Sequence, residues 1–466
     1  MKKISIALIL AFTLIAGIPV SARETENNPV IEQARAFTSE FYEMMLLLLE
    51  DYTGRELTPE LLYEAALRGM AGELDAYSEY MGASEFKNFT DSLSGRFEGV
   101  GIQIDADGGD YLYIYNVIAN SPAEEAGLLK GDRILGINGE DAGGFTQQQA
   151  VDFIKNADKT VNLDILRGTE KHSFSMEKRV IVLDPVEVNE FGGSFFYAGE
   201  NGENIRYVYL SSFDAESASS FKKAVEKLTA DNVEGIVLDM RGNSGGYLDQ
   251  VVSIARMILP DGVIYYEVNS SGEKTACYSR LETPPFKHIA VLADGYTASA
   301  AELLAAALQD SGIATVIGEV TYGKGVIQTS VDLITGGAFK YTYAEYLRRS
   351  GEKINKIGVI PDVFVKLPDM LFGAIIPDEN GESDQVLPLK DALKFLGYEI
   401  TDGSALYDEQ TKSQVLAFKE ASGLETTDGL DEEFIDALNA ALDLYYTEKD
   451  AALEIACEVL LKKLGK

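Results

Sequence analysis

The sequence predicts an α/β core with helical segments at both ends and a smaller β-rich block inserted ahead of the core. Two observations support this prediction. Between about residues 180 and 368, short apolar runs that read as strands alternate with helical patterns, which is typical of a layered α/β domain. Between about residues 97 and 180, glycines separate short β-rich runs around one helical stretch. The 466 residues suggest roughly three domains.

Several classes of protein are excluded by the composition. There are 75 acidic and 40 basic residues, giving a formal net charge of −35. This balance argues against general nucleic-acid binding and against anionic membrane surfaces as the main partner, since both require basic surfaces. The two cysteines, Cys277 and Cys457, lack the spacing of a zinc knuckle or a disulfide framework. His172 and His288 are the two histidines, and nothing in the sequence implies a metal or organic cofactor.

The N-terminus has the layout of a secretory signal peptide. Lys2 and Lys3 precede an apolar run, Ile4 to Val20, and Val20-Ser21-Ala22 then offers small residues for cleavage after Ala22. We therefore expect an exported protein, either secreted or associated with the cell envelope. An uncleaved membrane anchor is the alternative, because the run nearly reaches the ~17–25 residues that span a bilayer.

The expected helices and strands follow from hydrophobic periodicity and from turn signals. Residues 31–84 are predicted to be helical, and Thr58-Pro59 marks a helix start. The last helix is predicted to begin at Thr447, with Asp450 three residues on as in a capping box. Expected strands are residues 101–104, 111–117, 161–166, 205–210, 235–240, 289–293 and 314–317, and expected helices are residues 146–156, 215–228, 248–259 and 300–308.

Two glycine-rich segments match motifs of two different functions, nucleotide binding and hydrolysis. The first, Gly318 to Gly325, fits G-x-x-x-x-G-K, but it has glycine where a phosphate loop needs Ser or Thr and precedes a strand, so we reject nucleotide binding. The second, Gly242 to Gly246, fits the G-x-S-x-G nucleophile elbow around Ser244. Asp261 and His288 follow in triad order, so a hydrolase or esterase that uses Ser244 and His288 is an alternative function.

A third segment, Asp294 to Glu302, places Ser299 at the start of an Ala-rich helix. The free amides at a helix N-terminus can stabilise an oxyanion, so Ser299 is a candidate nucleophile. A plain serine N-cap is the alternative interpretation.

Lys324 lies between Gly323 and Gly325, where the chain can draw its ammonium inward. A desolvated lysine has a lowered pKa and can act as a general base for a serine. With a strand period of two, Gln328 lies on the same face and could orient the amine. In this scheme Gly245 and Gly246 supply a second oxyanion amide. An exposed lysine in a glycine turn is the alternative.

Several ordered motifs resemble those of the C-terminal processing peptidases, also called tail-specific proteases. The resemblance runs from about residue 35 to residue 366. It is carried by residues 68–70, 74–81, 239–246, 297–302 and 322–328.

This resemblance implies a core with the crotonase-like β-spiral of the family and a serine endopeptidase with a Ser–Lys dyad. Ser299 would be the nucleophile, Lys324 the base and Gln328 its orienter, and the backbone amides of Gly245 and Ala300 would form the oxyanion hole. Three positions depart from the family's usual residues, none of them carrying the chemistry: Thr297, Ala301 and Ser244. Asp310 matches a polar family position, with an ordinary helix-end residue as the alternative.

The block from Phe97 to about Glu177 resembles a PDZ domain. Gly99-Val100-Gly101-Ile102 matches the loop that binds a peptide's C-terminal carboxylate, while the peptide adds a strand to the sheet. The resemblance therefore implies protein substrates with accessible C-terminal tails. Arg167 resembles a family arginine that couples the PDZ position to the active site, and a surface arginine in a turn is the alternative.

Residues 387–442 resemble a peptidoglycan-binding module, although Lys419 stands where that family usually has Gln. Peptidoglycan and a homodimer built on the terminal helices are the other expected partners, and a non-catalytic PDZ and wall-binding scaffold is a further alternative. The expected domains are a signal peptide (1–22), an N-terminal helical region (23–90), a PDZ domain (91–179), a serine protease core (180–368), a peptidoglycan-binding-like domain (369–446) and a C-terminal helix (447–466).

Overall fold

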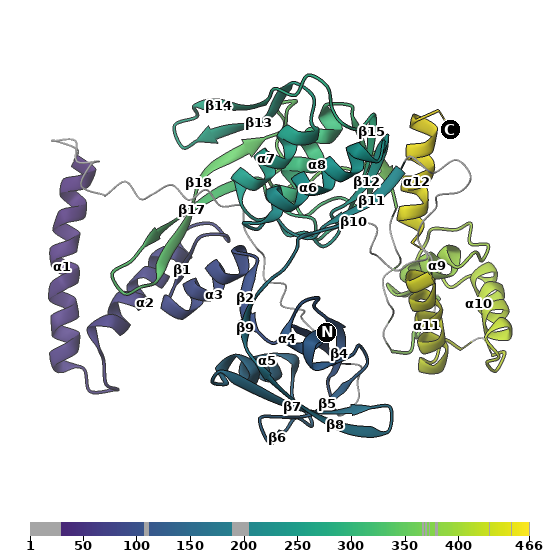
Figure 1. The fold of residues 1–466 in the computed structure, drawn as a ribbon, viewed down its shortest axis with the longest axis horizontal. Coiled ribbons are helices and arrows are strands. Elements are labelled where there is room, and N and C mark those ends of the chain that lie inside the picture. The colour runs from purple at the N-terminus through teal and green to yellow at the C-terminus, as the bar shows by residue number, and fades with distance from the viewer. Residues whose placement is uncertain are drawn as a thin grey trace.

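The computed structural model describes most of the chain after the predicted signal peptide (Figure 1). The described residues are 29–106, 111–188, 205–365, 368, 371, 373–377, 381–427, 429–448 and 450–465. The predicted signal peptide, residues 1–22, lies outside them. None of the helices in this described part is both long enough and apolar enough to cross a membrane.

A six-stranded sheet forms the centre of the core, in the order β10-β11-β12-β15-β16-β19. The strands are β10 (Val186–Val188), β11 (Ile205–Leu210), β12 (Gly235–Asp239), β15 (His288–Ala293), β16 (Ala314–Gly318) and β19 (Val363–Phe364). β10 is antiparallel to β11, and the others run parallel. Because parallel strands end at the same edge of a sheet, the loops after β12 and β15 emerge side by side.

Helices cover both faces of this sheet. α6 (Ser217–Ala230), α7 (Leu248–Ile258) and α8 (Ala300–Asp310) pack on one face, and α12 (Ala451–Lys463) packs on the other (Figure 1). Successive residues of a strand point to opposite faces. Accordingly, Ile236 and Leu238 join the cluster with α7 and α8, whereas Val237 joins the cluster with α12. The predicted core strands and helices are confirmed to within two residues at each end.

A second sheet brings the N-terminal region against the core. It contains β1 (Glu79–Met81), β13 (Gly262–Asn269), β14 (Lys274–Ser279), β17 (Val326–Asp332) and β18 (Ala338–Leu347). The prediction of helix throughout residues 31–84 is wrong at β1, because these residues pair with β18 and bury Tyr80 and Met81. The helices of this region are α1 (Pro29–Asp51), α2 (Pro59–Gly72) and α3 (Ala83–Leu93), and Thr58 caps α2 as predicted.

The inserted β-rich block folds around its own apolar core. A two-stranded antiparallel ribbon connects it to the rest of the molecule (Figure 1). The ribbon consists of β2 (Arg96–Gly99) and β9 (Arg179–Val182). The block contains β3 (Ile102–Asp105), β4 (Tyr113–Val117), β5 (Arg133–Ile137), β6 (Glu140–Asp141), β7 (Thr160–Arg167), β8 (Glu170–Glu177), α4 (Pro122–Ala126) and α5 (Gln147–Asn156). β3 lies at the edge of its sheet.

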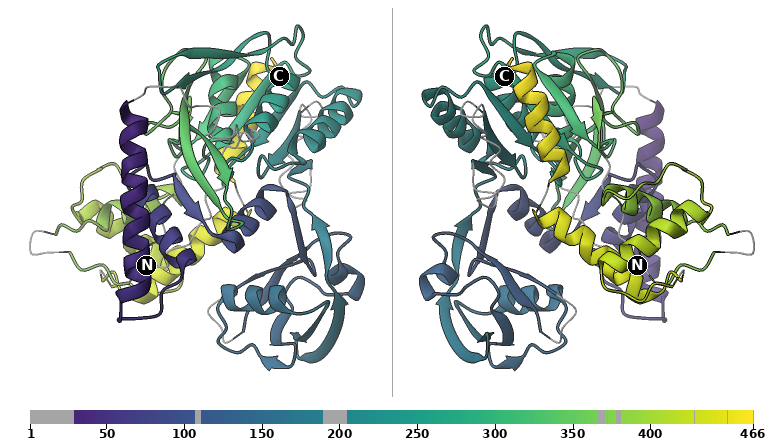
Figure 2. Two further views of the ribbon diagram at one scale, coloured as in Figure 1. Left: turned by 90° about the vertical axis from the view of Figure 1, so that its left-hand side faces the viewer. Right: turned by 90° about the vertical axis from the view of Figure 1, so that its right-hand side faces the viewer.

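The C-terminal helices divide between two sites. α9 (Val386–Phe395), α10 (Glu409–Ala421) and α11 (Glu432–Glu448) share one small core, while α12 lies apart from them on the central sheet (Figure 2). The predicted start of the last helix at Thr447 is wrong, since α11 runs through that residue. The N-cap is Asp450 itself, whose side chain accepts a hydrogen bond from the Leu453 amide.

Close packing of α8 gives the first prediction. Every residue from Ala300 to Leu308 is buried, so Ala305→Leu would add three carbons where no space exists. We expect the core to lose about 1–3 kcal/mol of stability by overpacking, measured as earlier unfolding in urea. Ala65→Leu makes the same change at an exposed position of α2 and serves as the control. Equal unfolding curves for the two variants would contradict this description of the core.

Candidate active site

Ser299 lies at the junction of the loop that follows β15 and the N-terminus of α8. Its side chain is buried, and its backbone has φ 56° and ψ −115°. A positive φ is uncommon and strained for a residue with a side chain, and such strain gathers at functional sites. The next residue, Ala300, begins the helix, so its amide is one of those that α8 leaves without an intrahelical acceptor.

Lys324 is fully buried, so the alternative of an exposed lysine is wrong. Its Nζ donates a hydrogen bond to Gln328 Oε1 at 3.0 Å, and Gln328 Nε2 donates to the carbonyl oxygen of Tyr77 at 2.5 Å. The predicted contact is present, but regular strand alternation does not produce it. Lys324 precedes β17, and the β17–β18 register shifts between Ile327 and Gln328. The Tyr77 ring centroid lies 4.7 Å from Nζ, so the N-terminal region encloses the amine.

The surroundings of Lys324 favour its neutral form. Burial lowers its pKa to about 7, and the positive charge of Lys340 acts in the same direction, against the carboxylates of Asp75, Glu302 and Glu79. Lys340 is itself buried and ion-paired with Glu79. A lysine with a pKa near neutrality can accept a proton at physiological pH, which an ordinary lysine cannot.

Glu302, which the sequence reasoning missed, links the segment that carries Ser299 to the segment that carries Lys324. Its Oε2 accepts hydrogen bonds from the amides of Ser299 and Lys324, both at 2.8 Å. Its Oε1 accepts from the Gly323 amide at 2.7 Å and from Thr321 Oγ1 at 2.5 Å. Burial raises the pKa of this carboxyl, and these four donors oppose the shift. The Ser-x-x-Glu capping-box pattern was the signal that could have found it.

Tyr346, which the sequence reasoning also missed, adds a second link between the two segments. Its buried hydroxyl lies 2.8 Å from the carbonyl oxygen of Ser299 and 2.5 Å from that of Lys324. Because it comes from β18 without any motif around it, no local sequence signal marks it.

The loop after β12 packs directly against Ser299. A Cβ on Gly245 would lie 2.9 Å from Ser299 Cβ and 3.0 Å from the Ala300 nitrogen, and its φ is 102°, so only glycine fits here. The Gly245 amide donates to Asn243 Oδ1 at 2.9 Å. Gly246 instead pairs with Phe213, so Gly245 is the residue of this loop that faces Ser299.

His288 lies at the opposite end of the sheet from Ser244. It begins β15, whereas Ser244 follows the carboxyl end of neighbouring β12. At about 3.3 Å per residue, the length of these strands separates the two by on the order of 15 Å. His288 Nε2 contacts Thr315 Oγ1 at 3.0 Å, and burial lowers its pKa. The alternative base for Ser244 is therefore excluded by position.

Arg167 and Asp310 both have partners away from the dyad. The Arg167 guanidinium forms a bidentate ion pair with the Asp132 carboxylate, with Nε–Oδ1 and Nη2–Oδ2 distances of 2.7 and 2.8 Å. It also donates a hydrogen bond to the Gly127 carbonyl oxygen. These contacts stay within the inserted block. Asp310 lies at the far end of α8, where it pairs with Arg348 and so fastens the end of β18 to the helix.

The loop Gly99 to Ile102 leads into the open edge of β3. Gly101 has φ 89°, and a Cβ there would lie 2.2 Å from Ser121 Cβ, so the turn requires glycine. On the α5 side of this edge, Gln147 Nε2 donates to the Ile104 carbonyl oxygen at 2.7 Å.

The chain is similar to several known proteins. The model of peptidase family S41 matches residues 204–365, and the PDZ domain model matches residues 90–166. The carboxy-terminal processing protease CtpA of Bacillus subtilis is 30% identical over 480 residues, covering 99% of this chain and 100% of that protein. CtpB of the same organism is 30% identical over 462 residues, covering 96% and 92%. A solved photosystem II D1 C-terminal processing protease is 26% identical with a TM-score of 0.44, covering 73% of this chain and 93% of that one.

The lowered pKa of Lys324 predicts the pH dependence of Ser299 reactivity. Only the neutral amine can take the serine proton, so labelling of Ser299 by a fluorophosphonate should rise with pH through a midpoint of about 7. Mass spectrometry of the labelled peptide measures the rate. A midpoint near 10, the ordinary lysine range, would contradict the desolvated base.

Lys340→Gln tests the electrostatic part of that shift. Removing the neighbouring positive charge should raise the pKa of Lys324 and move the labelling midpoint to higher pH. Lys353→Gln, at an exposed lysine paired with Glu345, is the control and should leave the midpoint unchanged. An unmoved midpoint in Lys340→Gln would show that the charge of Lys340 does not contribute to the lowered pKa of Lys324.

Proposed function

Since this chain belongs to the carboxy-terminal processing proteases of peptidase family S41, a serine-type family, we propose that Ser299 and Lys324 form its Ser–Lys dyad. The observation that supports the assignment is the buried amine of Lys324, held by Gln328 and enclosed by Tyr77. Glu302 fixes the backbone of both dyad residues.

In this mechanism the neutral amine of Lys324 accepts the Ser299 hydroxyl proton as Oγ attacks the scissile carbonyl carbon. The resulting ammonium then gives its proton to the leaving amine, and the C–N bond breaks to leave an acyl-enzyme. The amine next takes a proton from water as the water oxygen attacks the ester carbonyl carbon. The ammonium then returns this proton to Ser299 Oγ as the C–Oγ bond breaks, which releases the new carboxyl group and restores the free serine. Gln328 Oε1 accepts from Nζ throughout and keeps the amine aimed in one direction.

The negative charge that develops on the carbonyl oxygen requires amide donors. We assign this role to the amides of Ala300, at the start of α8, and of Gly245, which packs beside it. The Gly245 amide would exchange its Asn243 acceptor for the oxyanion. The amide is thus already satisfied in the free enzyme, and the exchange favours the charged transition state over a neutral carbonyl.

In this proposal the PDZ domain selects the protein substrate. The Gly99 to Ile102 loop binds the C-terminal carboxylate of a protein tail, and the tail adds a strand to the edge of β3. Arg167 remains the candidate that couples the PDZ position to the active site, for which it would first have to leave Asp132.

Two further partners and the location belong to the same proposal. Exposed apolar side chains along α1, including Phe37 at 58% and Leu47 at 52% exposure, support a homodimer built on this helix. The α9–α11 module is the candidate peptidoglycan-binding domain, although Lys419 is buried there and bonds the Gly429 carbonyl oxygen. The signal-peptide pattern of residues 1–22 supports export.

Single substitutions test the dyad. Ser299→Ala and Lys324→Ala should each lower the cleavage rate of an unfolded protein reporter by at least about 1,000-fold, because each removes a reacting group. Ser244→Ala and His288→Ala should keep substantial activity. Full activity in Ser299→Ala would disprove the dyad, and a wild-type chain that cleaves no tailed reporter would favour the scaffold alternative.

Amidation of a substrate's C-terminus tests how the tail is recognised. The amide lacks the charge that the Gly99 to Ile102 loop is expected to bind, so its kcat/KM should fall relative to that of the free acid. A matched pair of peptides with the same sequence provides the comparison. Equal rates for the two peptides would rule out recognition of the C-terminal carboxylate and would leave the proposed dyad unaffected.

A further inference from the structure

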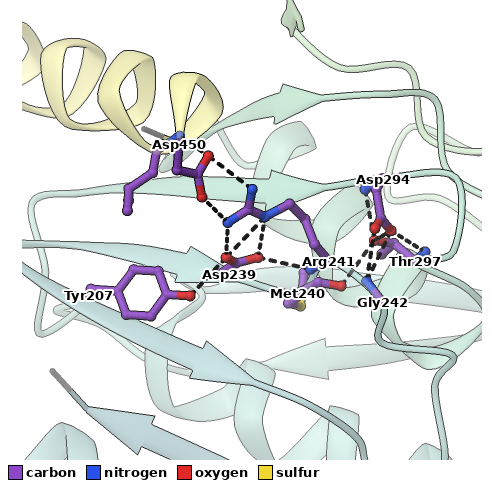
Figure 3. Close-up of polar contacts among 9 residues, drawn as sticks. Tyr207, Asp239, Met240, Arg241, Gly242, Asp294, Thr297 and Asp450 are labelled. Atoms are coloured by element: carbon purple, nitrogen blue, oxygen red, sulfur yellow. Dashed lines mark hydrogen bonds and ion pairs between the residues drawn. The ribbon is translucent and has the colours of Figure 1, made fainter. Parts of the chain in front are cut away.

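Arg241 stands between the end of β12 and the loop that carries Gly245, and its guanidinium joins two carboxylates (Figure 3). Nε lies 3.0 Å from both oxygens of Asp239, which also accepts a hydrogen bond from Tyr207 at 2.8 Å. Nη1 and Nη2 reach Asp450 at 3.0 and 2.6 Å. Asp450 is 209 residues away in the sequence, so the ion pair links distant parts of the chain.

The Asp450 carboxylate has two functions at once. Its Oδ1 accepts from the Leu453 amide at 3.0 Å and caps α12. Both oxygens also hold the guanidinium in a fork, a geometry that fixes direction as well as distance. The side chain is only 18% exposed, so solvent screens the pair less than it would a surface pair. The position of Arg241 is therefore set by α12 as well as by Asp239.

Docking of α12 is built into the core. Its buried residues close one face of the central sheet. At Gly235 a Cβ would lie 2.8 Å from Leu460 Cδ1, so helix and sheet are in close contact. The last helix is thus a layer of the protease core, and its N-terminus is fixed beside the end of β12.

From Arg241 the chain passes directly into the turn beside Ser299. The Gly242 amide donates to both oxygens of Asp294, at 3.0 and 3.1 Å, and Asp294 also accepts from the Thr297 amide (Figure 3). The Ala298 amide donates to the Asn243 carbonyl oxygen at 2.9 Å. The turn is tied to the nucleophile loop on one side and to Arg241 on the other.

We propose that Asp450 is a positioning residue for the oxyanion turn, through which the C-terminal helix sets the activity of the protease. The docked helix holds Arg241, and Arg241 holds the residues that lead to Gly245. The proposal rests on the oxyanion role proposed above for the Gly245 amide. It makes an intact, docked C-terminal helix a condition for full turnover, although no residue of that helix contacts the dyad in the described contacts.

Asp450→Asn in the full-length chain is the test, because asparagine is also a good N-cap but carries no charge for the guanidinium. We expect kcat for the peptide reporter to fall about tenfold, a fraction of the ~100-fold that a 1 Å misplacement costs, while KM stays within about twofold. The pH midpoint should stay where it is, since Asp450 is not among the groups that shift the Lys324 pKa.

Two matched variants separate this role from a loss of stability. Glu458→Gln removes an exposed carboxylate from the same helix and should keep the wild-type kcat. Leu460→Ala weakens the packing of α12 but leaves the ion pair in place. It should therefore lower the melting temperature, while the enzyme that remains folded keeps close to the wild-type kcat. The proposal is overturned if Asp450→Asn has the same kcat as Glu458→Gln. It is also overturned if Leu460→Ala, at an equal loss of melting temperature, loses as much kcat as Asp450→Asn.

A double-mutant cycle with Arg241→Lys completes the test. An ammonium cannot fork both carboxylates, so Arg241→Lys alone should also lower kcat. Asp450→Asn added to it should cause little further loss, because both changes break one link. Fully multiplicative losses would overturn the proposal. Labelling of Ser299 in the wild type, measured in parallel, tests the dyad separately from this link.

Discussion

The candidate active site depends first on one buried carboxylate. Glu302 accepts hydrogen bonds from the amides of Ser299, Gly323 and Lys324 and from the Thr321 hydroxyl. Loops after two different strands would otherwise leave these donors buried and unsatisfied, which is costly in a protein interior. By satisfying all of them, Glu302 fixes the backbone of Ser299, the proposed nucleophile, relative to that of Lys324, the proposed base. The strained φ of Ser299 can persist because this contact and the packing of α8 determine its position.

A parallel sheet suits this chemistry because it delivers several loops to one edge. The loops after β12, β15 and β16 carry Gly245, Ser299 and Lys324, the residues proposed for the oxyanion turn, the nucleophile and the base. All three strands are neighbours running in one direction. Helix α8 adds its N-terminal amides at the same edge. The fold thus supplies most of the site by topology, and the side chains of Lys324 and Gln328 supply what remains.

Most of the core was predictable because its signals are local. Apolar runs such as Ile205–Leu210 identify buried strands, and the Ser299 and Lys324 motifs are short and ordered along the chain. What escaped prediction depends on tertiary contacts. β1 is extended because it pairs with β18, and Tyr346 reaches the site from a strand without a motif. The start of α12 at Ala451 follows from Asp450, which both caps it and pairs with Arg241.

The strength of the base is assembled from segments that are remote in sequence. Glycines flank Lys324 and let the chain turn inward, but desolvation requires a cover, and the ring and carbonyl of Tyr77 provide part of it. Lys340, which pairs with Glu79 across the β1–β18 contact, adds a positive charge near the amine. The N-terminal region therefore helps to set the environment of the proposed base. If it moved away, water would reach Nζ, the pKa would return toward that of an ordinary lysine, and the serine would lose its base.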